Sequence, residues 1–160
     1  MSHIHSPAHL IEVTSRQKAM PVDPNHIRHL VSQMLTRLGY PQAEISIQLV
    51  DNASIANLNQ SRLSHEGPTD IITFPMSQPD DPVLEGELAI SAEWAKETAL
   101  ANSDNPLDEL TLYLAHGLLH LAGQDDIAPE DARAMRFREY QLLTSLGITL
   151  PKNRFGEWQE

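Results

Sequence analysis

The chain has 160 residues, 11 of them basic and 22 acidic, which gives a formal net charge of −11 at pH 7. This length fits one domain with a hydrophobic core. The excess of acidic residues argues against an extensive basic surface that would bind nucleic acid. Because cysteine is absent, only histidine and carboxylate side chains remain as strong metal ligands. Neither a membrane span of about eighteen apolar residues nor a secretory signal is predicted, so we expect a cytoplasmic protein without a membrane partner.

The first half of the chain alternates between strand and helix patterns. Alternating apolar and β-branched residues are typical of strands, and an Asp–Pro pair before apolar residues at helical spacing is typical of a capped helix. The predicted elements, in chain order, are a strand at 9–15, a helix from Pro24 to Gly39, a strand at 44–51, a short helix at 52–60 and a loop at 61–69.

The second half begins with two short strands and then becomes helical. Its predicted elements are a strand at 70–75, a polar connection at 77–86, a strand at 87–91 and helices at 91–101, from Pro106 to Gly123 and from Pro129 to Leu146. This order predicts an α+β fold with a small mixed four-stranded sheet, covered by about five helices that lie mainly on one face. We expect a flexible N-terminal tail at 1–8, a single domain over 9–150 and a C-terminal tail at 151–160.

The stretch AHGLLHLAGQDD carries a candidate metal site. His116 and His120 are four residues apart, so both imidazoles project from one face of a helix and can reach one divalent ion, as in a zincin-like metal-binding helix. Gly123 lets the chain turn back, and Asp125 or Asp126 can then supply an oxygen ligand. Three protein ligands leave one position open, which is typical of catalytic zinc. Alternatively, the histidines are ordinary surface or core residues and Asp126 caps the next helix.

This stretch departs from the zinc-protease signature HExxH at one position. Gly117 stands where that signature has its glutamate. Peptide hydrolysis is therefore disfavoured, because the leaving amine must be protonated by a positioned acid. An ion that activates water and polarises a phosphoryl oxygen does not require this glutamate.

Three motifs resemble the YbeY family of single-strand-specific metallo-endoribonucleases, which act in ribosomal RNA maturation and ribosome quality control. The family patterns H-G-x-L-H-L-x-G-Y-D-H, L-N-x-x-Y-R-x-x-x-x-P-T-D-V-L-S-F-P and G-D-I-x-I-S compare with HGLLHLAGQDD, LNQSRLSHEGPTDIITFP and GELAIS here. The resemblance implies one zinc ion on His116, His120 and Asp126, with Asp126 in the place of the family's third histidine. For Asp125, a hydrogen bond in the loop or to a metal-ligating residue is favoured over ligation of the ion.

A second departure concerns the family's phosphate-contacting arginine, which aligns with Leu63. Two nearby residues are candidates for this catalytic role. Arg62 can take it if the loop shifts by one residue, and His65 lies in the same loop. The alternative for Arg62 is a solvated loop charge.

The resemblance also implies the function and the partners. We expect a zinc-dependent endoribonuclease that acts in 3′-end maturation of small-subunit ribosomal RNA. The expected partners are single-stranded RNA, the ribosome and ribosome-associated proteins, with no DNA. Two alternatives stay open: a non-catalytic ribosome-assembly factor with a structural metal and, less favoured, a metallopeptidase.

Overall fold

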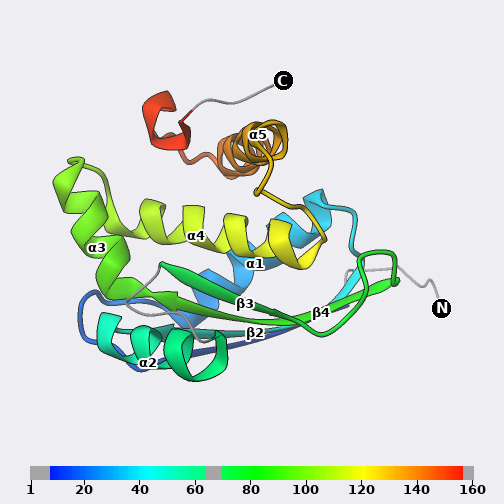
Figure 1. Cartoon of the computed structure of the whole chain (residues 1–160), viewed down its shortest axis with the longest axis horizontal. Helices are drawn as coiled ribbons and strands as arrows, with labels where there is room; N and C mark the ends of the chain where they lie inside the picture. Colours follow the sequence, from blue (N-terminus) through cyan, green and yellow to red (C-terminus); the bar gives the residue numbers. More distant parts are fainter. Residues whose placement is uncertain (1–7, 64–69, 157–160) are drawn as a thin grey trace.

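The computed structural model describes residues 8–63 and 70–156 (Figure 1). Its elements are β1 (Ala8–Ser15), α1 (Pro24–Arg37), β2 (Gln42–Val50), α2 (Asn52–Leu63), β3 (Ile71–Pro75), β4 (Val83–Ser91), α3 (Ala92–Ala101), α4 (Pro106–Leu121), α5 (Pro129–Ser145) and the 3-10 helix η1 (Lys152–Phe155). This confirms the predicted α+β fold. Within the described residues, none of the helices combines the length and the apolar character that crossing a membrane requires.

The four strands form one mixed sheet in the order β1-β2-β4-β3. β1, β2 and β4 are parallel to one another, and β3 is antiparallel to β4. Ile45 and Ile47, at alternate positions of β2, point into the main core. Glu44 and Gln48, which belong to the other set of alternate positions, are exposed. This two-residue period places one face of the sheet against the helices.

The strand β4 begins four residues before the strand that the sequence predicted at 87–91. The sequence predicts a polar connection over Val83 to Gly86, but these residues continue the parallel pairing with β2. A strand through Gly86 is not predicted from the sequence, because glycine is rare in the interior of strands. Glycine fits here because α4 packs closely against this position: a Cβ at Gly86 would lie 2.6 Å from Cδ2 of Leu121.

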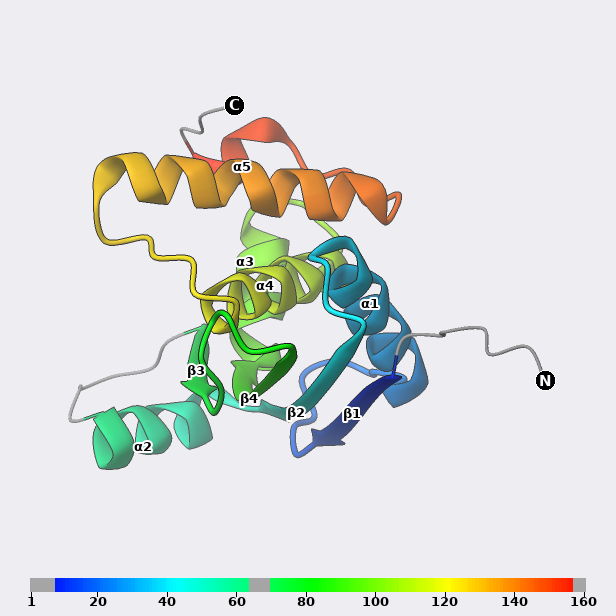
Figure 2. The ribbon, with the colours of Figure 1, turned by 90° about the vertical axis from the view of Figure 1, so that its right-hand side faces the viewer.

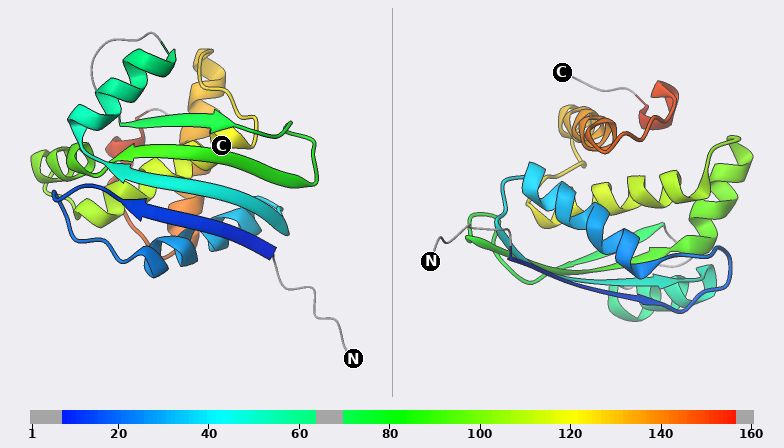
Figure 3. Two further views of the ribbon diagram at one scale, coloured as in Figure 1. Left: turned by 90° about the horizontal axis from the view of Figure 1, so that it is seen from below. Right: turned by 180° about the vertical axis from the view of Figure 1, so that it is seen from behind.

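The helices cover the two faces of the sheet unequally. α1 and α4 lie on one face, and α5 forms a further layer on the outer side of α4 (Figures 1 and 2). α2 lies on the opposite face and covers only one end of it (Figure 3). A small second core, formed by Val50, Ile55, Ile72 and Ala89, lies under α2. The prediction of helices mainly on one face therefore holds.

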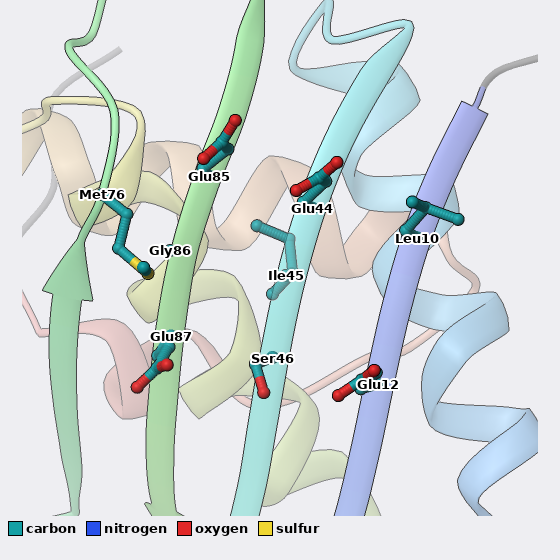
Figure 4. A pocket seen from close by; sticks show the side chains of 9 residues that line it. All are labelled: Leu10, Glu12, Glu44, Ile45, Ser46, Met76, Glu85, Gly86 and Glu87. Atoms are coloured by element: carbon teal, nitrogen blue, oxygen red, sulfur yellow. The ribbon is translucent and has the colours of Figure 1, made fainter.

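The rest of the face that carries α2 is open and acidic. Leu10, Glu44 and Glu85 form one row across β1, β2 and β4, and Glu12 and Glu87 lie in the next row (Figure 4). These side chains line a shallow hollow of about 270 Å³. The stretch with both histidines belongs to α4, on the other face of the sheet.

The packed structure continues past residue 150, where the sequence predicted the end of the domain. Phe155 in η1 is 3% exposed and makes an edge-to-face contact with Tyr140 of α5. Arg154 forms ion pairs with Asp104 and Glu109. Residues 152–155 of the predicted C-terminal tail therefore pack onto the rest of the domain. At the other end, β1 already includes Ala8, the last residue of the predicted N-terminal tail.

Candidate metal centre

Helix α4 presents its two histidines on the side away from the sheet. Asn105 caps the helix by accepting a hydrogen bond from the backbone N–H of Leu107, and Pro106 occupies its first turn. Gly117 lies against the sheet, because a Cβ there would be 2.5 Å from Cδ1 of Ile71. The position that carries the glutamate in HExxH thus faces β3 and β4 in this protein.

His116, His120 and Asp126, here called the ligand cluster, bring three donor atoms together. The Nε2 atoms of the two histidines lie 3.1 Å apart. The Oδ2 atom of Asp126 lies 3.4 Å from Nε2 of His120 and 3.7 Å from Nε2 of His116. The three side chains are 29%, 25% and 38% exposed, in the order His116, His120, Asp126. The cluster is therefore half-buried and open to a small ligand.

The turn after α4 returns Asp126 to the histidines. Gly123 has a φ of +95°, which a residue with a side chain rarely adopts, and it ends the helix. The Asp125 carboxylate accepts a hydrogen bond from the backbone N–H of Ile127 at 3.0 Å. Asp125 therefore stabilises the loop, as expected, and Asp126 is the aspartate that joins the ligand cluster.

Glu139 of α5 forms a hydrogen bond with the ring nitrogen of His116 that points away from the ligand cluster. The sequence did not predict this contact. The Oε2 atom of Glu139 lies 2.9 Å from Nδ1 of His116, and its side chain is 9% exposed. A carboxylate only accepts hydrogen bonds, so Nδ1 carries the hydrogen and Nε2 is left to bind an ion. Its place in the sequence could have indicated this role, because Glu139 lies four residues after Met135 and four before Leu143, on the buried face of α5.

The electrostatic environment of His116 favours a cation. Burial disfavours the charged ring, but the hydrogen bond to Glu139 and the negative charges of Glu139, Asp70 and Asp126 outweigh it and raise the pKa of His116. The negative charges that stabilise a protonated His116 would also attract a divalent ion bound at its Nε2 atom. Asp70, at the start of β3, thus acts on the cluster through its charge.

The geometry of the cluster fits a single zinc ion. Two imidazole nitrogens and one carboxylate oxygen are donors that zinc accepts, and such atoms around a tetrahedral ion lie about 3.3 Å apart. The three observed separations, from 3.1 to 3.7 Å, bracket this value. Within the described ranges, this is the group of histidine and carboxylate side chains that could hold a metal ion.

Replacing Glu139 with glutamine should lower zinc affinity about 10- to 100-fold. Glutamine keeps the shape of the side chain but lacks the charge that fixes the His116 ring and its Nδ1 hydrogen. Competition for zinc with a chromophoric chelator measures the change. The matched control is Glu130→Gln, the same substitution at an exposed position in the first turn of α5. Equal zinc affinities for Glu139→Gln and wild type would contradict the positioning role of Glu139.

Comparison with known proteins connects this site to a family. The model of the family described as "Endoribonuclease YbeY" matches residues 12–147, a range that includes the whole ligand cluster. The chain belongs to the YbeY endoribonuclease family. This confirms the resemblance that the three sequence motifs suggested, and it supports an endoribonuclease role.

Two YbeY-family relatives show how far the similarity extends. Endoribonuclease YbeY of Rhodopirellula baltica is 40% identical over 115 residues, which are 71% of this chain and 59% of that protein. Endoribonuclease YbeY of Carboxydothermus hydrogenoformans is 34% identical over 142 residues, 87% of this chain and 99% of that protein. The solution structure of a Thermotoga maritima protein is similar in fold, with a TM-score of 0.58 and 21% identity, covering 86% of this chain and 92% of that one.

The two candidates for the YbeY-family arginine remain predictions. The backbone of Arg62 belongs to the last turn of α2, but its side chain lies outside the described residues. All of His65 lies outside them too. The loop predicted at 61–69 is shorter than expected at its start, since α2 extends to Leu63.

Proposed function

We propose that this chain is a zinc-dependent endoribonuclease that cuts single-stranded RNA at the ligand cluster. Family membership supports RNA as the substrate. The observation that carries the proposal is the convergence of His116, His120 and Asp126, with Glu139 fixing the His116 ring. In the cell, we propose 3′-end maturation of small-subunit ribosomal RNA and ribosome quality control, in the cytoplasm, with the ribosome and ribosome-associated proteins as partners.

The chain's own residues define which chemistry the site can support. A bound zinc ion would supply Lewis acidity toward water and a phosphoryl oxygen. Asp126 brings a negative charge where the family pattern has a histidine, so it strengthens the hold on a cation and reduces the net positive charge near phosphate. We propose that Arg62 or His65 compensates by contacting the phosphate. Position 117 faces the sheet and offers no acid to a leaving amine, which separates this site from HExxH peptidases.

Removing both histidines, in a His116→Ala/His120→Ala variant, should lower the rate of single-stranded RNA cleavage at least about a hundredfold, because Lewis-acid assistance contributes several kcal/mol. The measurement is cleavage of a labelled single-stranded oligonucleotide by zinc-loaded proteins, with circular dichroism confirming that each is folded. The matched control is His26→Ala/His29→Ala, which removes two exposed histidines from α1.

Two results would oppose this function. Equal cleavage by wild type and the His116→Ala/His120→Ala variant would exclude the ligand cluster as the catalytic site. The alternative of an assembly factor with a structural metal predicts that chelation unfolds the chain, while RNA processing persists in a folded ligand variant. We expect chelation to leave the fold intact, because the main hydrophobic core contains none of the three ligands.

A further inference from the structure

A second hollow, of about 650 Å³, adjoins the ligand cluster and is here called the His120 hollow. The connection between β3 and β4 forms one wall with Met76, Gln78, Pro79 and Asp81, and the C-terminal end of α4 forms the other with His120. The two walls touch, since a Cβ at Gly123 would lie 2.7 Å from Cβ of Pro79. His120 thus belongs to both the ligand cluster and this hollow.

The lining of the His120 hollow suits an uncharged planar group better than a phosphate. Pro75 and Pro79 supply apolar surface. Asp81 supplies a negative charge, and neither lysine nor arginine is found among the described residues that line the hollow. A nucleobase has two apolar faces and a polar edge, and proteins bind unstacked bases between such surfaces.

The polar groups of the hollow form a turn that leaves acceptors for a ligand. The backbone N–H of Gln78 donates to Oδ2 of Asp81 at 2.9 Å, and the backbone N–H of Asp81 donates to the carbonyl of Gln78 at 3.0 Å. These bonds fix the turn and engage one carboxylate oxygen of Asp81, and the second oxygen can accept a hydrogen bond from a ligand. Carboxylates accept hydrogen bonds from the exocyclic amino groups of bases, and uracil has no such group.

We propose that the His120 hollow seats the nucleobase next to the cleaved phosphodiester and favours bases with an exocyclic amino group over uracil. The selecting group is the carboxylate of Asp81, and Pro75 with Pro79 forms the apolar wall. This inference rests on the proposed function, because the base is bound as part of the RNA substrate.

Binding of single nucleosides tests the hollow without any cleavage. The probe is the backbone amide signal of Gly123, which lines the hollow, in protein labelled with ¹⁵N. Cytidine should shift this signal at concentrations about tenfold lower than uridine does, and Asp81→Asn should remove most of the difference. The matched control is Asp80→Asn, the same change at the neighbouring exposed position, which is not among the residues that line the hollow. Equal shifts with cytidine and uridine in the wild type would overturn the proposal.

The pattern of RNA cuts tests the same selection during cleavage. A single-stranded oligonucleotide that contains every dinucleotide step, cut by the zinc-loaded protein, should show about tenfold more cutting beside amino-bearing bases than beside uracil. Asp81→Asn should bring this ratio close to one without changing zinc affinity, and Asp80→Asn should leave it unchanged. Cleavage with a pattern that Asp81→Asn does not alter overturns this inference alone. If the zinc-loaded wild type cuts no RNA, the proposed function and this inference both fail.

Discussion

Replacing Gly117 with glutamate is expected to destabilise the protein by more than about 4 kcal/mol, although it completes the HExxH signature. Position 117 faces β3 and β4, where an added Cβ alone would lie 2.5 Å from Cδ1 of Ile71 and 2.9 Å from Cδ2 of Leu88. A carboxylate among these apolar side chains loses its hydration and gains no partner. Urea-induced unfolding, followed by circular dichroism, should show a lower midpoint.

Alanine at the same position separates crowding from charge. The nearest atoms are the flexible ends of Ile71 and Leu88, so overpacking should cost about 1–3 kcal/mol. Alanine recovers about 1 kcal/mol through its higher helix propensity. Gly117→Ala should therefore be destabilised by less than about 2 kcal/mol. A Gly117→Glu protein as stable as the wild type would contradict the close contact between α4 and the sheet, and one that cleaves peptides would contradict the orientation of position 117.

Replacing Arg154 with methionine is expected to cost about 3–5 kcal/mol of stability. Arg154 donates hydrogen bonds from Nε to Asp104 at 3.1 Å and from Nη2 to Glu109, whose side chain is 2% exposed. Burial opposes the charge of Arg154, but these two carboxylates outweigh it and raise its pKa. Without the guanidinium, Glu109 becomes a buried carboxylate that has lost its cation. Scanning calorimetry should show a Tm lower by on the order of 10 °C.

Two further variants test whether this loss comes from the ion pairs. Arg138→Met makes the same change at an exposed position of α5 and should shift stability by less than about 0.5 kcal/mol. Adding Glu109→Gln to Arg154→Met should restore part of the loss, because it removes the unpaired buried charge. An unchanged Tm for Arg154→Met would contradict the assignment of η1 to the packed domain.

Local patterns predicted most of the fold because the signals for its elements lie within a few residues. Asp23, Ser91 and Asn105 each cap a helix through a hydrogen bond to a backbone N–H two or three residues later. The same reasoning found His116 and His120, whose spacing is a property of one helix. It failed at the start of β4, where pairing with β2 and the contact of Gly86 with Leu121 outweigh local propensity.

Contacts between residues far apart in the sequence could not be predicted from local sequence patterns. Glu139 lies 23 residues from His116, and Arg154 lies 45 residues from Glu109. A buried charge on a helix shows that a partner is needed, but only the packing of α5 and η1 against α4 identifies it. The sequence left Asp125 and Asp126 as alternatives until the resemblance was considered. In the structure, the Asp125 carboxylate accepts a hydrogen bond from the backbone N–H of Ile127, and Asp126 lies beside the histidines.

The central claim is that one divalent ion binds at the ligand cluster, and anomalous X-ray scattering tests it most directly. Crystals grown with zinc, measured at the zinc absorption edge, should show a single anomalous peak between Nε2 of His116, Nε2 of His120 and the carboxylate of Asp126. A folded, zinc-treated protein with no peak there, or with its zinc bound elsewhere, would contradict the account.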